Sequence, residues 1–398
     1  MDTIAAEINA IVDEVRALRH DLHRHPELAY EEHETVARVK AFMGSLTGAE
    51  IQTGIGGTGM TVLFGKEIEG PCVALRADMD ALAMEEESGV EWSSTVPGKM
   101  HACGHDGHTA MLAGAARILS RHVDSLQGPV KLIFQPAEEG GAGGLAMCEA
   151  GVLKDPAVSA IFGLHNNLPD PSMKIGSLAY TSGAAMAGTG TFDIEVLSSG
   201  GHAAFPHRCV DPVYVGACIV EQLHGIVSRM IDPIKSAVIT VTRFEAGSAY
   251  NIIPSKAVLR GTFRALDRTI LEMLQETITK RATEVARAHG AEVRIRCELG
   301  YPVLVNDAKA EDTFRRVLAE LGQADRMVEV QPNMGGEDFA YFARQVPGFF
   351  YFLPACPVDQ DSVHGCHHPS FDFNDDLLAD GIRLHVETAL QFARLWKT

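Results

Sequence analysis

The amino-acid sequence predicts an α/β protein in which a small inserted unit splits a larger domain. Its 398 residues exceed what one ordinary hydrophobic core accommodates, so two domains are expected. Along the first part of the chain, strand patterns alternate with segments of helical periodicity, which is typical of a sheet covered by helices on both faces. Residues 186–297 differ, because they predict the order strand–helix–strand–strand–helix–strand, the ferredoxin-like pattern.

The larger domain, assigned to residues 1–185 and 298–398, alternates apolar helix faces with short β-rich runs bounded by glycine or proline. Pro26 interrupts the first helical pattern, because proline lacks the main-chain N–H that a helix interior needs. The expected elements are a helical pattern within residues 1–45 that resumes at 31–43 after the break, a helix at 107–119, and strands at 60–64, 72–75 and 130–134.

The inserted unit carries its own complete set of elements. Its strands alternate apolar and polar residues, as half-buried strands do, and its two helical segments are long. We expect strands at 191–196, 237–242, 257–263 and 292–298, and helices at 211–230 and 268–289.

Composition excludes several classes of function. The formal net charge of −18 repels phosphate backbones, so no nucleic-acid partner is expected. No stretch approaches the roughly 20 unbroken apolar residues that a membrane helix needs, and no secretory signal is visible. The eight cysteines include no Cys-x-x-Cys pair, which fits a reducing compartment better than a disulfide framework. We expect a cytoplasmic protein without membrane partners.

One glycine pattern suggests a site that its context excludes. Residues 54–59 fit Gly-x-Gly-x-x-Gly, which in dinucleotide-binding proteins opens a helix whose N-terminus meets the pyrophosphate. The residues that follow, 60–64, are rich in β-branched and aromatic side chains and predict a strand. A glycine-rich hairpin is therefore expected, and no dinucleotide site.

Side chains that bind metals gather in four clusters that lie far apart in the sequence. Residues 101–108 hold three histidines and Cys103 directly before a predicted helix, and imidazole and thiolate are good ligands for divalent metals. Glu138 and Glu139 follow a predicted strand, and His165 follows another apolar run. Further histidines stand near the C-terminus, at 364, 367 and 368.

Each cluster alone has a simpler explanation, such as a solvated acidic turn, a buried core histidine or a histidine-rich loop. Together they place thiol, imidazole and carboxylate groups at positions 103, 105, 138, 139, 165 and 367. One zinc ion normally takes three or four protein ligands, so this set suits two metal ions better than one. Such a site would activate a water molecule and polarise a carbonyl group.

The chain resembles the M20 metallopeptidase family, in particular its branch of hippurate hydrolases, N-acyl-L-amino acid amidohydrolases and plant auxin-conjugate hydrolases. The resemblance extends almost from end to end and is carried by sequence blocks at 19–28, 76–82, 101–108, 135–140, 201–207, 250–254 and 335–339. It implies a mixed-sheet catalytic domain of the di-metal peptidase type, with residues 186–297 as a lid and dimerisation domain.

The resemblance also implies roles for single residues. The family's metal ligands fall on Cys103, His105, Glu139, His165 and His367, where His367 is chosen because it begins the pattern His-x-Pro-x-aromatic. They would hold two divalent ions per subunit, which could be Zn, Mn, Co or Ni. Glu138 falls on the catalytic base and Asp80 on an aspartate that orients a ligand. The role of Asp78 stays open, because the wider family has a metal-binding histidine there.

In the lid, His202 falls on a histidine that reaches the site of the partner subunit and polarises the scissile carbonyl. Asn251 and Arg264 fall on positions that bind the free carboxylate of the substrate. The resemblance thus implies a homodimer or homotetramer acting on small-molecule N-acyl amino acids.

The resemblance implies hydrolysis of the amide bond of N-acyl amino acids by a metal-activated water molecule, with Glu138 as general base. Two alternatives stay open: a dipeptidase or aminopeptidase of the same family, and a non-catalytic dimer that keeps its metals as a scaffold. The sequence leaves the acyl group, the amino acid and the native metal undetermined.

Overall fold

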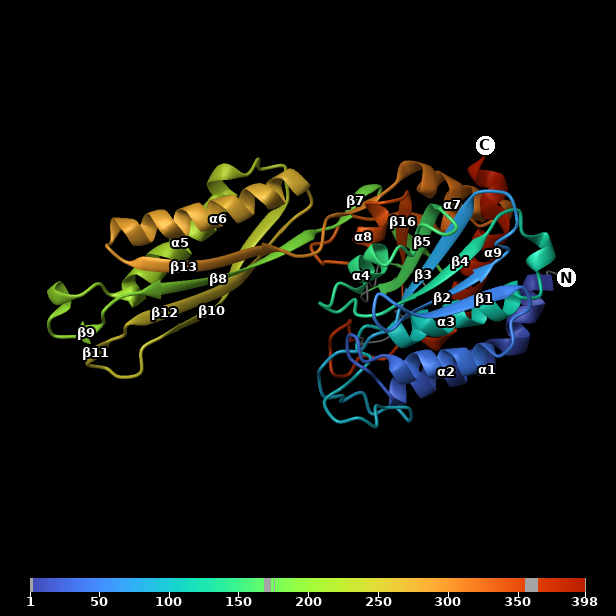
Figure 1. Cartoon of the computed structure of the whole chain (residues 1–398), viewed down its shortest axis with the longest axis horizontal. Helices are drawn as coiled ribbons and strands as arrows, with labels where there is room; N and C mark the ends of the chain where they lie inside the picture. The colour runs from blue at the N-terminus through green and yellow to red at the C-terminus, as the bar shows by residue number, and fades with distance from the viewer. Residues whose placement is uncertain (1–2, 168–172, 175, 355–363, 398) are drawn as a thin grey trace. The chain divides into compact units, whose positions relative to one another are not determined.

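The computed structural model describes residues 3–167, 173–174, 176–354 and 364–397 and divides the chain into two compact units (Figure 1). The larger unit comprises Met1–Gly183, Val305–Gln331 and Asp338–Thr398, and the smaller unit comprises Ala184–Leu304 and Pro332–Glu337. Among the described residues, none of the helices combines the length and apolar character that a bilayer span requires.

The larger unit is built on an eight-stranded sheet of mixed direction, which confirms the predicted fold class. β3 pairs in parallel with β4 and β5, and β5 pairs in parallel with β16, whereas β1, β2 and β4 pair antiparallel. In spatial order the strands are β1 (Ala49–Ile55), β2 (Gly59–Phe64), β4 (Val130–Gln135), β3 (Cys72–Asp78), β5 (Val158–Asn167), β16 (Gly348–Pro354), β6 (Leu178–Tyr180) and β15 (Met327–Glu329).

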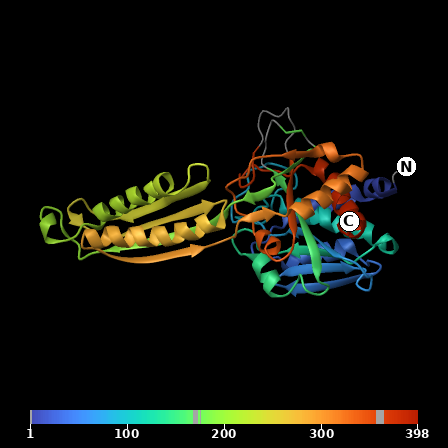
Figure 2. The same cartoon turned by 90° about the horizontal axis from the view of Figure 1, so that it is seen from above.

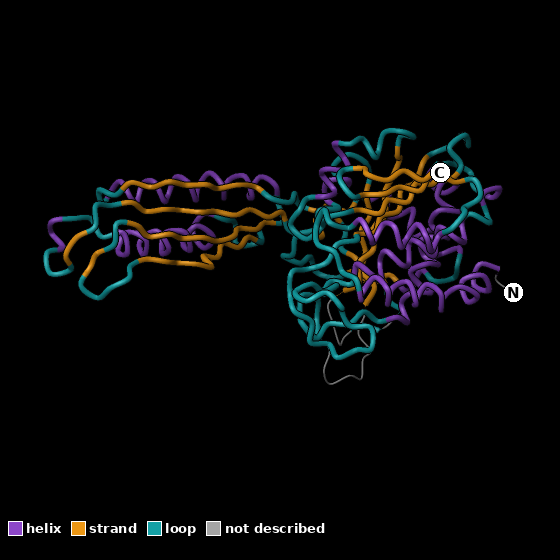
Figure 3. Tube along the Cα trace, turned by 60° about the horizontal axis from the view of Figure 1, so that its bottom comes forward, coloured by secondary structure: helices purple, strands orange, loops and turns teal. Residues whose placement is uncertain are grey.

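Helices cover this sheet, and in Figure 3 they gather beside the strands as separate layers. α3 and α9 pack on β3, α7 packs on β5 and β16, and α1 and α2 pack on α3. α4 packs on β4 and contacts α8, which packs on β16. Their bounds are α1 (Thr3–Arg24), α2 (His33–Met43), α3 (His105–Leu119), α4 (Gly143–Glu149), α7 (Ala308–Glu320), α8 (Ala340–Ala343) and α9 (Leu378–Trp396).

Local sequence explains these elements. The buried residues of α1 recur at intervals of three or four, as in Ile8, Ile11 and Val15, and the helix ends at Arg24, shortly before Pro26. Strands β2, β3 and β4 are buried along their whole length, which is typical of strands covered on both faces.

The predicted glycine-rich hairpin is confirmed, because β1 and β2 pair antiparallel through the turn that contains residues 54–59. Gly56 has a φ of +63°, and a Cβ there would lie 2.6 Å from the main-chain nitrogen of Met147. Glycine is therefore needed for the turn itself and not for approach to a phosphate.

The smaller unit contains a four-stranded antiparallel sheet in the order β10-β12-β8-β13. Helices α5 and α6 lie side by side on one face of it (Figure 2). Each is capped by an aspartate that accepts two main-chain hydrogen bonds, Asp211 for α5 and Asp267 for α6. Along the chain the elements are β8 (Gly188–Leu197), α5 (Pro212–Met230), β10 (Ala237–Ala246), β12 (Lys256–Ala265), α6 (Arg268–Ala288) and β13 (Glu292–Leu299).

Four short strands complete the description. They form two further pairs, β9 (Gly201–His202) with β11 (Ile252–Ile253), and β7 (Gly183–Met186) with β14 (Leu304–Asn306). The smaller unit also has its own apolar core, which includes Phe192, Ile219, Leu259 and Leu274. The lid role expected for residues 186–297 stays a prediction.

Candidate metal centre

Three neighbouring parallel strands of the larger unit bring candidate residues to one edge of the sheet. β4, β3 and β5 run in the same direction, so their carboxyl ends meet there. Asp80 follows β3, Glu138 and Glu139 follow β4, and His165 lies near the end of β5. The sheet thus gathers residues from three separate sequence clusters.

Two further candidates flank the first turn of α3, which begins at His105. Between Cys103 and His105, Gly104 has a φ of +86°, in the left-handed region. A Cβ at Gly104 would lie 2.3 Å from Oδ1 of Asn166, so only glycine fits this approach. This glycine lets the chain place a thiol and an imidazole two residues apart at the same site.

Within the described part of the chain, two of the four groups of side chains that could hold a cation share Glu139. Cys103, Glu139 and His367 each offer one donor atom, and these atoms lie within 4.8 Å of one another. The same holds for His105, Glu138 and Glu139. Glu139 belongs to both groups, and its Oε1 lies 3.0 Å from Nε2 of His367. Two adjacent groups with a shared carboxylate fit a pair of cations.

Hydrogen bonds orient the ring of His165 toward the thiol. Its Nδ1 donates to the main-chain oxygen of Asn166 at 2.6 Å, which leaves a lone pair on Nε2, 3.4 Å from Sγ of Cys103. Burial holds the pKa of His165 well below its ordinary value, so the ring stays neutral. His367 is held nearby by a 2.7 Å hydrogen bond from its main-chain N–H to the oxygen of Ala102.

His105 shows most directly that the site suits a cation. Its Nδ1 donates to the main-chain oxygen of Asp80 at 2.9 Å, whereas its buried Nε2 has no hydrogen-bond partner among the described residues. Burial alone would lower the pKa of His105, but the carboxylates of Asp78, Asp80 and Glu139 raise it well above its ordinary value. The same negative field would favour a divalent cation, which displaces that proton on binding.

Asp80 connects the two parts of the site. Its Oδ1 accepts a 3.0 Å hydrogen bond from the main-chain N–H of Glu138, and its Oδ2 accepts one of 2.9 Å from that of Glu139. Its main-chain oxygen accepts the hydrogen bond from Nδ1 of His105. This buried aspartate therefore fixes the turn that carries both glutamates and orients one histidine ring.

Asp78 and His108 bind each other and lie next to the site. The carboxylate of Asp78 accepts from Nη1 of Arg76 at 2.7 Å and from Nδ1 of His108 at 2.6 Å. Nε2 of His108 accepts from the main-chain N–H of Asn166 at 2.9 Å. Because both of its ring nitrogens are engaged, His108 has no lone pair left for a metal, although its atoms lie close to those of His105.

Several residues that support the site were not assigned from the sequence. Gln135 Nε2 and the main-chain N–H of Gly144 both donate to Asp338, at 2.7 Å each, and Arg76 Nη2 approaches the same carboxylate at 3.1 Å. These buried contacts fix the end of β4 just before the glutamates. Their sequence positions could have indicated this role, because Arg76, Gln135 and Asp338 lie in the blocks that carry the family resemblance.

The remaining predicted site residues, His202, Asn251 and Arg264, belong to the smaller unit. His202 lies in β9, is exposed, and accepts a 3.1 Å hydrogen bond at Nδ1 from the main chain of Ala204. Asn251 immediately precedes β11, which pairs with β9, so these two residues lie close together. Arg264 lies in β12 and donates from Nη1 to the main-chain oxygen of Met334 at 2.7 Å.

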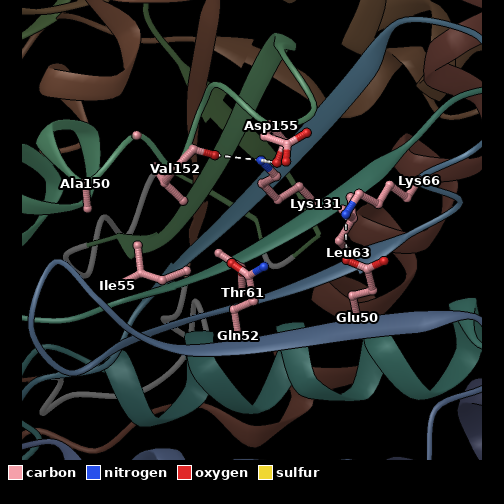
Figure 4. A pocket seen from close by; sticks show the side chains of 11 residues that line it. Glu50, Gln52, Ile55, Thr61, Leu63, Lys66, Lys131, Ala150, Val152 and Asp155 are labelled. Atoms are coloured by element: carbon pink, nitrogen blue, oxygen red, sulfur yellow. Dashed lines mark hydrogen bonds and ion pairs between the residues drawn. The ribbon is translucent and has the colours of Figure 1, made fainter.

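A separate cavity of about 210 Å³ lies in the larger unit, and no candidate ligand lines it (Figure 4). The two lysines that line it are already engaged. Lys131 donates to the main-chain oxygens of Val152 and Asp155 at 2.7 and 2.8 Å, and Lys66 pairs with Glu50 at 3.0 Å. The metal chemistry therefore belongs to the strand ends and not to this cavity.

Known proteins share both the sequence and the fold. Residues 74–391 match the family described as peptidase family M20/M25/M40. The chain is 39% identical over 391 residues to IAA-amino acid hydrolase ILR1-like 4 of Arabidopsis thaliana, covering 97% of this chain and 87% of that protein. It is 34% identical over 378 residues to N-acetylcysteine deacetylase of Bacillus subtilis (strain 168), covering 94% of this chain and 95% of that protein.

Among solved structures, a dinuclear metal binding peptidase of the M20 family from Bacillus subtilis superimposes with a TM-score of 0.80. It is 31% identical, and the match covers 97% of this chain and 99% of that one. The family match, the hydrolase relatives and the groups of donor side chains all indicate an amide-cleaving enzyme that binds metal ions. The chain therefore belongs to the M20 peptidase family and is a metal-dependent amidohydrolase whose centre binds two metal ions.

Proposed function

We propose that this amidohydrolase cleaves the amide bond of N-acyl amino acids, with Glu138 as the general base. The observation that carries the proposal is the placement of Glu138. Its buried carboxylate lies beside a group of metal-binding side chains, and Asp80 fixes its main chain. A purely structural metal site has no need for an additional carboxylate held next to its ligands.

The proposed ligands are Cys103, His105, Glu139, His165 and His367. Their sulfur, nitrogen and oxygen donors suit zinc and also manganese, cobalt or nickel. When bound, the metal ions would lower the pKa of a water molecule and stabilise negative charge on the carbonyl oxygen.

Glu138 would perform the proton transfers of the reaction. It would take a proton from the water molecule as that water attacks the amide carbon. It would then pass the proton to the nitrogen of the departing amino acid, which leaves as a free amine. Asp80 would keep this carboxylate and the ring of His105 in place throughout.

The substrate class is supported by relatives whose names specify amino acids with a blocked nitrogen, namely IAA-amino acid hydrolase and N-acetylcysteine deacetylase. We assign recognition of the free carboxylate to Asn251 and Arg264, because a guanidinium binds a carboxylate through two parallel hydrogen bonds. His202 would polarise the scissile carbonyl from a partner subunit.

The proposal includes a homodimer, which could pair further into a tetramer. Exposed apolar side chains gather on the smaller unit, as expected for a surface that another subunit covers. They include Phe205, Tyr214, Ile234, Phe244 and Tyr250. We also propose a cytoplasmic location, since all cysteines of the described residues are free thiols.

A second candidate is cleavage of peptide bonds, because two relatives from Saccharolobus solfataricus are named thermostable carboxypeptidases and are 36% and 35% identical. The deciding experiment compares N-acetyl amino acids, N-benzoylglycine and dipeptides as substrates, with metal-loaded and with chelated protein. Metal-dependent turnover that is fastest on the acylated amino acids is expected. Faster turnover of dipeptides would favour the second candidate, and no turnover with any metal would favour a scaffold.

A further inference from the structure

Two cysteines that are distant in sequence lie beside each other at the metal centre. Sγ of Cys366 lies 3.8 Å from the main-chain oxygen of Cys103, so the second thiol contacts the residue that carries the first. Nδ2 of Asn166 donates to Sγ of Cys366 at 3.4 Å, which fixes the position of the second thiol. Both cysteines are free thiols in the structure.

The main chain holds these two cysteines together. The hydrogen bond from His367 to the oxygen of Ala102 joins the residues that directly adjoin Cys366 and Cys103. His367 has a φ of +66°, so this bond lies in a turn, and it holds the two cysteine-bearing segments directly against each other. Disulfides join cysteines whose Cα atoms are roughly 4.4–6.8 Å apart, so two cysteines on directly adjoining segments are suited to form one.

We propose that Cys103 and Cys366 form a reversible disulfide when the protein meets a peroxide, and that this bond releases metal from the centre. The proposal rests on the role of Cys103 as a ligand. A divalent metal binds the thiolate, and a sulfur that is bonded to another sulfur no longer offers one.

The chemistry balances with hydrogen peroxide as the oxidant. Sulfur of Cys366 attacks one peroxide oxygen, the O–O bond breaks, and a sulfenic acid and one water molecule form. Sulfur of Cys103 then attacks the sulfenic sulfur and displaces its hydroxyl group as a second water. The two thiols lose two hydrogens and two electrons in total, and the peroxide is reduced to water.

Exposure assigns the two roles. Cys103 is only 8% exposed, whereas Cys366 is partly exposed. A small oxidant from solvent therefore meets Cys366 first, and Cys103 acts as the resolving thiol. This is the usual arrangement of a redox-sensitive pair, in which an accessible cysteine lies next to a second one.

The test uses zinc-loaded full-length protein exposed to hydrogen peroxide. Digestion without reductant should yield a peptide pair that joins Cys103 to Cys366, with the loss of two hydrogens. Zinc should appear in solution, as measured with a metal-binding dye, and reductant with added zinc should restore the zinc content. Cys366→Ala should release zinc roughly tenfold more slowly, because no adjacent thiol is left to form the bond. Cys297→Ala, which removes another partly exposed cysteine, should respond as the wild type does.

Two results would overturn the proposal: the absence of the linked peptide from oxidised wild-type protein, or equally fast zinc release from Cys366→Ala. The reduced Cys103→Ala variant separates this failure from failure of the proposed site. If that variant kept its full zinc content, Cys103 would not be a metal ligand. Disulfide formation would then not release metal, even if the linked peptide forms in the wild type.

Discussion

The carboxylate of Asp80 accepts a hydrogen bond of 3.0 Å from the main-chain N–H of Glu138. The other oxygen of this carboxylate accepts from Glu139, so one side chain fixes the positions of the proposed base and of a proposed ligand. The structure thus links metal binding and proton transfer through a residue that needs to touch neither metal nor substrate.

Asp80→Asn tests this link. The amide keeps one acceptor oxygen but turns an NH₂ group toward a main-chain N–H, so one of the two hydrogen bonds is lost. We expect kcat to fall by about 10- to 100-fold, the usual effect of removing a group that supports metal ligands. The exposed Asp325 provides a control, because Asp325→Asn should leave kcat unchanged. Equal rates for Asp80→Asn and the wild type would remove Asp80 from the mechanism.

Glu138→Gln separates proton transfer from metal binding. The glutamine has nearly the same shape but takes no proton from water at neutral pH. Metal content, measured by elemental analysis, should stay at two ions per chain, while kcat should fall by about 10²- to 10⁴-fold. A variant that loses both its metals and its activity would instead identify Glu138 as a ligand.

His165→Ala should show the opposite pattern. Its Nε2 faces the thiol of Cys103, and the neighbouring imidazole of His108 cannot replace it, because His108 uses both of its ring nitrogens. We expect elemental analysis to find a lower metal content, with activity falling in parallel. In His108→Ala the metal content should fall less, because that ring binds Asp78 and the main chain of Asn166 and is not a proposed ligand. Full metal content in His165→Ala would contradict its assignment as a ligand.

Gly104→Ala tests the turn between Cys103 and His105. An alanine there would have a φ of +86° and a Cβ 2.3 Å from Asn166. Gly247→Ala is a matched control, since Gly247 has a φ of +75° with no atom within 4 Å of the added Cβ. Both variants carry the left-handed strain of about 1–2 kcal/mol, but only the first also has the steric clash. Thermal unfolding should show a larger loss of stability in Gly104→Ala, together with a lower metal content.

Much of this site could be predicted because its residues lie in short, informative patterns. The ends of β3, β4 and β5 follow from apolar runs, and parallel strands necessarily bring those ends to one edge. The mutual hydrogen bond of Asp78 and His108 could not be predicted, since it depends on which ring nitrogen of the histidine faces which partner. The contact of Cys366 with Cys103 was also invisible, because a hydrogen bond between residues more than 260 positions apart has no local signal.

The order of strands in the sheet also could not be predicted from local sequence patterns. β16, from near the C-terminus, lies between β5 and β6, although more than 150 residues separate it from either strand in sequence. Hydrophobic periodicity predicts that a segment is a strand but not which strand it joins. By contrast, the six main elements of the smaller unit could be predicted in order, because each is long and strongly patterned.

The buried pair of His23 and Asp106 should make stability depend on pH. Nδ1 of His23 lies 2.8 Å from Asp106, and its Nε2 lies 3.3 Å from Glu86. Burial opposes the charged ring, but these two carboxylates prevail and raise its pKa from 6.5 to about 9. A raised pKa means that the folded state binds the proton more tightly than the unfolded state. The stabilisation is therefore complete below pH 6.5 and is lost as the pH rises toward about 9.

His23→Gln should consequently be most destabilising at pH 6, by about 3 kcal/mol, with a smaller difference from the wild type at pH 10. Urea unfolding of chelated protein at a series of pH values measures this directly, since bound metal would add a pH dependence of its own. His224, exposed on α5, provides the control, because His224→Gln removes a histidine without a buried partner. A destabilisation by His23→Gln that is the same at pH 6 and pH 10 would show that the ring contributes packing alone, and the charged pair would have to be abandoned as its cause.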